Sequence, residues 1–214
     1  MAAFALGLSG GVMLTVVISD LLPTAWRLGG CRECILGFVS GWLLAGGFDF
    51  LLRQAEKEDF SSLMSLRRLG WLTVLGIAVH DFPEGMAIAM GCVAAENLGF
   101  LLALAVGLHN IPEGMATAAP LRAGGLSRAQ VLAVNVLLAL ATPAGAVLGM
   151  VLARRMPDFL SFMLALAAGT MGYLSMVAML PNALRYSWLL AFAGFLLGSG
   201  VILLLQSIIQ GTSG

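Results

Sequence analysis

Long apolar runs separated by short polar connections dominate this sequence of 214 residues. Each run has close to the 20 residues or so that an α-helix needs to cross the hydrocarbon core of a bilayer. The pattern therefore predicts an all-α, polytopic membrane protein with a single transmembrane domain over residues 1–214. We expect seven transmembrane helices, at about residues 1–22, 35–52, 69–92, 98–121, 129–153, 159–181 and 187–209.

Composition supports the membrane assignment, because 60% of the residues are hydrophobic and only 10% are charged, which is unlike a soluble domain. The first run lacks the basic start and the cleavage site of a signal peptide. Basic residues flank the runs, seven on the side shared with the N-terminus and four on the other. The positive-inside rule then predicts a cytoplasmic N-terminus and an external C-terminus in the cell inner (plasma) membrane. Residues 53–68 become a cytoplasmic linker, and no nucleic acid partner is expected.

An internal repeat relates the two ends of the chain. Residues 10–25 match residues 168–183 at an offset of 158, including a shared Leu-Pro pair. Residues 41–52 match residues 194–205 at an offset of 153. An odd number of crossings separates the copies, so they point in opposite directions, as in the inverted repeats of many secondary transporters. The helix that corresponds to residues 129–153 is missing before the first copy, which fits either a lost helix or a late start.

Two copies of one polar motif interrupt the central runs. The segments "VHDFPEGMA" (79–87) and "LHNIPEGMA" (108–116) share the form H-[DN]-x-P-E-G-M-A. The histidine and glutamate of each copy are four residues apart and therefore share one helix face. Each charge costs about 2.5–3.5 kcal/mol at the bilayer centre, so the pattern predicts a cation site rather than packing. The candidate ligands are His80, Glu84, His109 and Glu113, with Asp81 and Asn110 lining a neighbouring pocket.

The types of donor indicate which ion this site would take. Imidazole with carboxylate suits Zn²⁺ and its first-row neighbours, whereas Na⁺ or Ca²⁺ favours oxygen ligands alone. The expected partner is therefore a divalent ion as substrate, with Zn²⁺ first and Fe²⁺, Mn²⁺ or Cd²⁺ as alternatives, and no prosthetic cofactor. Polar pairing between helices and a metal-free proton relay remain alternatives. An intramembrane metal-dependent hydrolase is a weaker one, because the spacing is H-x-x-x-E rather than HExxH, so no enzyme is expected.

With these motifs, essentially the whole chain resembles the ZIP (Zrt/Irt-like) divalent metal transporters, particularly the bacterial GufA-type members. The resemblance implies a 3+2+3 inverted arrangement of eight helices and movement of zinc or a related ion toward the cytoplasm by alternating access. It also implies that the histidines and glutamates of the two motifs form one metal site. Asp81 and Asn110 would help to form an adjacent second site.

Three departures from the family pattern bear on activity. Thr142 stands before Pro143, where the family has a glutamate that bridges both metals. Ala178 stands where the family has an acid ahead of a Leu-x-Pro sequence. The usual first helix is missing. These departures leave an alternative open, in which the chain is a metal-binding but transport-impaired homologue or a sensor.

Further polar and sulfur-containing residues are candidates for the path or entrance of the ion. Asp20 is either an entrance ligand or an acid at a helix end, and Met13 either lines the path or fills a gap. Asn135 lies seven residues before Thr142 and so on the same face, where it offers an oxygen to the cavity or a hydrogen bond to another helix. Asp49 is expected at the cytoplasmic interface.

Small and sulfur-containing residues complete the picture. Cys31 and Cys34 form a CxxC in the first external connection, which would be a disulfide or half of a metal site. Glycines spaced by four, at 37 and 41 and at 194 and 198, permit close helix contacts and a homodimer.

Overall fold

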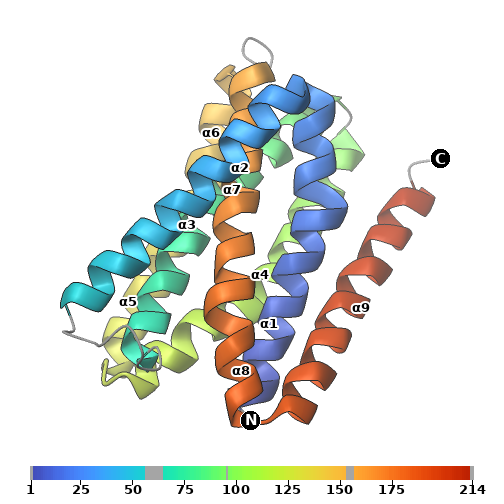
Figure 1. Ribbon diagram of the computed structural model, residues 1–214. Coiled ribbons are helices and arrows are strands. Elements are labelled where there is room, and N and C mark those ends of the chain that lie inside the picture. The colour runs from blue at the N-terminus through green and yellow to red at the C-terminus, as the bar shows by residue number, and fades with distance from the viewer. Residues whose placement is uncertain (1, 56–64, 95, 153–156, 213–214) are drawn as a thin grey trace.

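The computed structural model describes residues 2–55, 65–94, 96–152 and 157–212, and every regular element in these ranges is a helix. The helices run back and forth along one bundle, with the N-terminus at the bottom of Figure 1. The elements are α1 (Ala2–Val16), the π-helix η1 (Val17–Leu21), α2 (Leu22–Ala55), α3 (Leu66–Ala94), α4 (Glu96–Ala123), α5 (Arg128–Ala139), α6 (Ala141–Leu152), α7 (Pro157–Tyr173), the π-helix η2 (Leu174–Met179), α8 (Leu180–Tyr186) and α9 (Trp188–Thr212). The predicted all-α architecture is thus confirmed.

Five apolar stretches in the described part are long enough to cross a membrane, and the first of them, Ala3–Ala55, holds two antiparallel passes. Figure 1 shows α1 rising and α2 descending. Gly30 interrupts the helical backbone of α2 with a φ of 76° and a ψ of −167°, a conformation that a residue without a Cβ adopts easily. Residues 23–34 are therefore mostly helical rather than a loop, and the thiols of Cys31 and Cys34 are free.

The fifth pass is divided into α5 and α6 near a proline. A reciprocal capping box starts α5, because Ser127 Oγ accepts from Gln130 N (3.2 Å) and Gln130 Oε1 accepts from Ser127 N (2.9 Å). Pro143 has no N–H for the carbonyl four residues earlier, at Ala139, which is where α5 ends. The chain then resumes as α6, so Thr142 and Pro143 lie in the first turn of that helix.

Two helix pairs far apart in sequence pack through equivalent glycines. On α9, Gly194 and Gly198 lie against the carbonyl oxygens of Phe4 and Leu8 in α1. On α2, Gly37 and Gly41 lie in the same way against the carbonyls of Phe162 and Leu166 in α7. Gly11 of α1 and Gly169 of α7 complete the correspondence, because they meet the carbonyls of Phe195 and Phe38. Equivalent contacts are therefore related by offsets of 158 between α1 and α7 and 157 between α2 and α9.

These contacts correct the register of the second match in the internal repeat, which paired residues 41–52 with residues 194–205. The offset of 153 pairs Gly41 with Gly194, whereas the packing pairs Gly41 with Gly198, one helical turn further on. A slip of four residues keeps small residues on the same helix face, which is why the sequence match looked acceptable. The four glycines expected to permit a homodimer face helices of their own chain, so that surface is already used.

Replacing Gly41 by alanine should destabilise the protein by roughly 1–3 kcal/mol, because the added Cβ would collide with the backbone carbonyl of Leu166. Gly47→Ala is a matched control on the same helix, since a Cβ at Gly47 meets nothing within 4 Å. Thermal unfolding of the purified proteins checks the pair. Equal midpoints for the two variants would contradict the close packing of α2 on α7.

A buried ion pair joins α2, α3 and α7 near the point where α2 ends and α3 begins. Arg68 Nε donates to Asp49 Oδ1 (2.9 Å), and Tyr173 OH donates to Asp49 Oδ2 (3.0 Å). Arg68 is 1% exposed and Asp49 is 6% exposed. The carboxylate of Asp49 is therefore enclosed by an arginine and a tyrosine from two other helices, while its expected position at the cytoplasmic interface stays a prediction.

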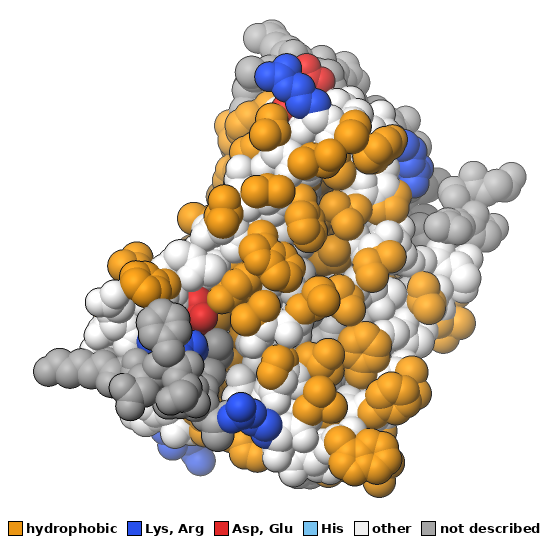
Figure 2. Space-filling model, in the orientation of Figure 1, with side chains coloured by type: hydrophobic (Ala, Val, Ile, Leu, Met, Phe, Trp, Pro, Cys, Tyr) orange, Lys and Arg blue, Asp and Glu red, His pale blue; other side chains and the backbone are white. Residues whose placement is uncertain are grey.

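The outer surface of the bundle is largely apolar. Large hydrophobic side chains on α5, α6 and α9 are exposed, among them Leu137, Met150 and Leu204. Figure 2 shows the face that α1, α2, α7 and α9 form, where hydrophobic side chains cover the middle and charged ones lie toward its two ends. Such a band matches the hydrocarbon core of a bilayer, where an apolar surface needs no protein cover.

Candidate metal centre

The two polar motifs lie at the heart of the bundle, on α3 and α4. Each motif contains a proline, Pro83 in α3 and Pro112 in α4, and each helix continues past it. α3 packs against α4, α6 and α7. Its approach to α6 is close because Gly85 lies against the carbonyl of Thr142, and Gly145 of α6 lies against that of Phe82. The motif on α3 is therefore enclosed by three helices.

Three side chains of α3 bring their donor atoms together. One ligand atom from each of His80, Asp81 and Glu84 lies within 4.8 Å of the other two. These residues are buried, with exposed fractions of 0%, 3% and 4%. The predicted proximity of His80 and Glu84 on one helix face is confirmed. Asp81 also brings a ligand atom into this cluster, and its role in an adjacent second site stays a prediction.

Glu113 reaches this cluster from α4 and is itself 1% exposed. Its Oε2 lies 3.1 Å from His80 Nε2, and Asp81 Oδ1 lies 3.4 Å from the same nitrogen. Two ligand atoms bound to one tetrahedral Zn²⁺ with bonds near 2.0–2.2 Å stand about 3.3–3.6 Å apart. The distances from His80 Nε2 to the two carboxylate oxygens, 3.1 Å and 3.4 Å, are close to that spacing.

The imidazole of His80 is oriented by the backbone of its own helix. Its Nδ1 lies 2.9 Å from the carbonyl oxygen of Gly76, which can only accept, so Nδ1 carries the hydrogen. In a neutral ring the lone pair of Nε2 then points toward the carboxylates of Glu113 and Asp81. A lone pair facing two acceptors requires a second proton or a cation, and a metal-ligating histidine typically has its other nitrogen bonded in this way.

Gly76 also fixes where this turn of α3 lies. A Cβ on Gly76 would collide with the side chain of Leu174, the first residue of η2. η2 thus packs directly against the turn that supplies the carbonyl for His80. The sequence motif did not include Gly76, because every residue type has a backbone carbonyl and the sequence cannot show which carbonyl accepts from His80.

Asn110 positions the carboxylate of Glu113 through a hydrogen bond. When its amide nitrogen faces the neighbouring acceptors, it donates to Glu113 Oε2 (3.1 Å) and to the Val106 carbonyl (3.3 Å). The other carboxylate oxygen, Glu113 Oε1, is buried and accepts no hydrogen bond within the described residues. Glu113 therefore has one oxygen held by Asn110 and His80 and one left for a further ligand.

The charge of the cluster favours a cation. Three carboxylates and one imidazole share a buried volume, and an isolated buried charge is costly unless it is paired or binds a metal. A divalent ion would cancel two of the three negative charges directly. Of the remaining predicted ligands, His109 lies within α4, but its side chain is outside the part of the chain that the structure describes.

Two candidates on the neighbouring pass have separate environments. Asn135 Oδ1 accepts from Thr117 Oγ1 (2.8 Å), which joins α5 to α4 as an interhelical hydrogen bond. The backbone carbonyl of Thr142 lies beside Gly85, the residue after Glu84. The Thr142 hydroxyl is buried without a hydrogen-bond partner among the described residues, and it carries no charge.

The candidates outside the cluster lie in α1 and η1. Met13 is fully buried in the hydrophobic core. Asp20 lies in η1 on the surface, where its Oδ1 accepts from Thr24 Oγ1 (3.3 Å). Ala178 lies buried in η2, the π-helix that precedes the second Leu-Pro pair just as η1 precedes the first. Among the described residues, Asp20 does not belong to the cluster around His80.

Known proteins with similar sequences carry one consistent description. Residues 51–206 match the family described as ZIP zinc transporter. The chain is 37% identical over 222 residues to the zinc transporter ZupT of Chlorobium phaeovibrioides, covering 94% of this chain and 84% of that protein. It is 36% identical to ZupT of Corynebacterium glutamicum, covering 85% and 77%, and 31% identical to ZupT of Streptococcus mutans, covering 85% and 75%.

Proposed function

Because the chain belongs to the ZIP zinc transporter family, we propose that it carries Zn²⁺ across the cell inner membrane into the cytoplasm through the cluster on α3 and α4. Family membership makes the chain a multi-pass membrane metal transporter rather than an enzyme. Fe²⁺, Mn²⁺ and Cd²⁺ are the competing substrates, since their ligand preferences overlap with those of Zn²⁺.

One observation carries the proposal more than any other. The donor atoms of His80, Asp81 and Glu113 are buried together at distances of 3.1 Å and 3.4 Å around Nε2. Glu84 adds a third carboxylate, and His109 on α4 is the proposed second imidazole. Because Thr142 adds no charge, a single ion is the expected content of the site. Asp20 on the surface of η1 is the proposed point of entry.

The proposed membrane arrangement has seven passes related by an inverted repeat. Support comes from the matched glycine contacts of α1 with α9 and of α7 with α2. Further support comes from the two π-helices, η1 and η2, which occupy equivalent places in the two copies. The basic residues favour a cytoplasmic N-terminus. Alternating access would then move the helices of the site relative to these two glycine-packed pairs.

Zinc uptake into sealed liposomes tests the function. Vesicles containing the purified chain and a zinc-sensitive dye should accumulate the ion faster than protein-free vesicles, and the rate should saturate with zinc concentration. Zinc binding should be measured on the same preparation. Binding without uptake would favour the transport-impaired homologue or sensor, whereas the absence of both would refute the proposed function.

A further inference from the structure

A cavity of about 430 Å³ lies between the start of α3 and the turn that joins α4 to α5, and none of the cluster residues His80, Asp81, Glu84 and Glu113 lines it. The turn approaches α3 closely, because Gly124 lies against the backbone of Arg67. Arg122 stabilises the turn, since its Nη1 donates to the carbonyl of Leu126. The side chains that line the cavity include Arg67, Trp71, Leu126, Gln130, Ala133 and Val134.

The described charged side chains around this cavity are positive. Arg67 lines it and is exposed, and none of the described residues that line it is acidic. Arg122 and Arg128 are also exposed, at the end of α4 and the start of α5. A guanidinium beside a cavity suits a phosphate, because its planar array of donors can bind two oxygens at once.

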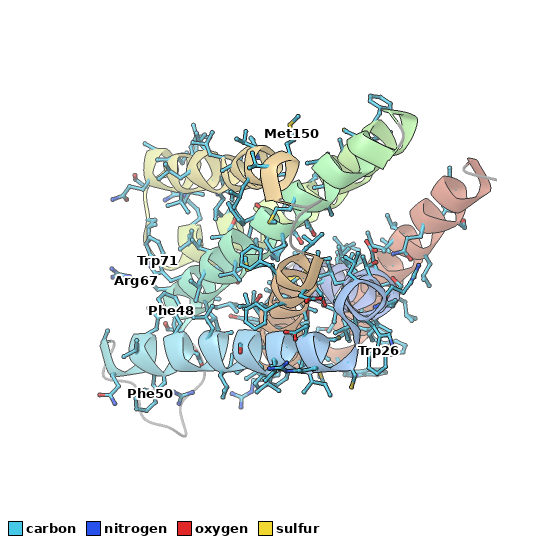
Figure 3. The ribbon with its side chains drawn as sticks, turned by 90° about the horizontal axis from the view of Figure 1, so that it is seen from above. Trp26, Phe48, Phe50, Arg67, Trp71 and Met150 are labelled. Carbon is cyan, nitrogen blue, oxygen red and sulfur yellow. The ribbon has the colours of Figure 1, made fainter. Side chains whose placement is uncertain are left out.

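Apart from Gln130 and the glycines of the turn, the remaining wall of the cavity is apolar. Trp71 is one helical turn beyond Arg67, about 6 Å further along α3. Figure 3 shows both side chains on the same outer side of the bundle. Tryptophan is enriched where headgroups meet acyl chains, and Ala133 and Val134 continue the apolar wall on α5. A ligand here would meet positive charge at one end and hydrocarbon-like surface at the other.

We infer that this cavity binds an anionic phospholipid, with Arg67 pairing with the headgroup phosphate and an acyl chain packing against Trp71, Ala133 and Val134. Basic pockets between transmembrane helices commonly take such headgroups. The lipid would bridge α3, which carries His80, and the turn that ends α4, which carries Glu113. It would therefore stabilise the packing of the two helices that hold the metal cluster.

Lipid-dependent thermal unfolding of the purified protein in a neutral detergent tests the inference. Phosphatidylglycerol should raise the unfolding midpoint of the unmodified chain by about 4 °C or more at saturation, and phosphatidylcholine should not. Arg67→Gln should abolish the shift, and Arg67→Lys should retain part of it. Ala133→Phe, which fills the cavity, should also abolish it. Arg185→Gln is the matched control, because Arg185 is an exposed arginine outside this cavity.

The outcomes separate the lipid from its alternatives. An equal shift in Arg67→Gln would overturn the inference and point to general surface charge. An equal shift with inorganic phosphate would overturn it in favour of a soluble anion. Since the measurement needs no zinc, a failed lipid response leaves the transport function standing, and failed zinc uptake leaves the lipid site standing.

Discussion

Replacing His80 by alanine should lower the affinity of the chain for Zn²⁺ on the order of 100-fold or more and reduce zinc uptake to the background of empty vesicles. Even the hydrogen-bond partners of metal ligands contribute 10–100-fold to affinity, and the Nε2 of His80 is the atom on which the carboxylates converge. Isothermal titration of the purified protein with zinc measures the loss.

Glu113→Gln distinguishes a lost ligand from a lost fold. The substitution keeps the shape of the side chain but removes one of three buried negative charges, so the zinc-free protein should unfold at the same temperature or a higher one. The rise in unfolding temperature that zinc produces should disappear. Glu33→Gln is the matched control, since Glu33 lies outside the cluster beside Arg32 (3.8 Å). Normal zinc affinity in either His80→Ala or Glu113→Gln would contradict the site.

The second large effect is expected at the buried ion pair, where Arg68→Met should destabilise the protein by about 3–5 kcal/mol. The substitution leaves the carboxylate of Asp49 enclosed without its cation, and breaking a buried pair from one side costs this much. Reversible unfolding in mixed micelles measures the free energy. The zinc affinity of the folded fraction should change little, because the pair lies outside the metal cluster.

Removing the whole polar group provides the complementary experiment. The triple variant Asp49→Leu, Arg68→Met and Tyr173→Phe leaves no buried charge or hydroxyl unpaired, and such replacements are often neutral or stabilising. Its stability should return most of the way to that of the unmodified chain. A triple variant as unstable as Arg68→Met alone would show that the loss comes from packing rather than from the uncompensated charge.

Local patterns in the sequence predict much of this architecture and part of the site. The apolar runs predict the helices, and the spacing of four predicts that His80 and Glu84 share a face. The duplicated motif also brings in Glu113 from the next helix. The helices and the shared face depend only on helical periodicity, which is the same wherever the helix sits in the fold, whereas the approach of Glu113 also needs α4 to pack beside α3.

Contacts between distant segments could not be predicted in the same way. The pairing of Asp49 with Arg68 depends on how α2 packs against α3, and no local pattern in the sequence predicts it. The carbonyl of Gly76 acts through the backbone, so its residue type indicates nothing about His80. The repeat register failed by four residues because small residues recur once per turn, and only the contacts of Gly41 with Leu166 resolve it.

The pairing of α1 with α9 has a consequence for how the protein is made. Helices emerge from the ribosome in chain order, so α1 is synthesised long before the helix that fills its glycine-lined face, and α2 similarly precedes α7. By contrast, α3 and α4 are neighbours in the chain and pack together extensively. Local contacts form early and distant ones late. During biosynthesis the hairpin that carries the metal ligands can therefore assemble first, while α1 is held by lipid or by the insertion machinery until α9 arrives.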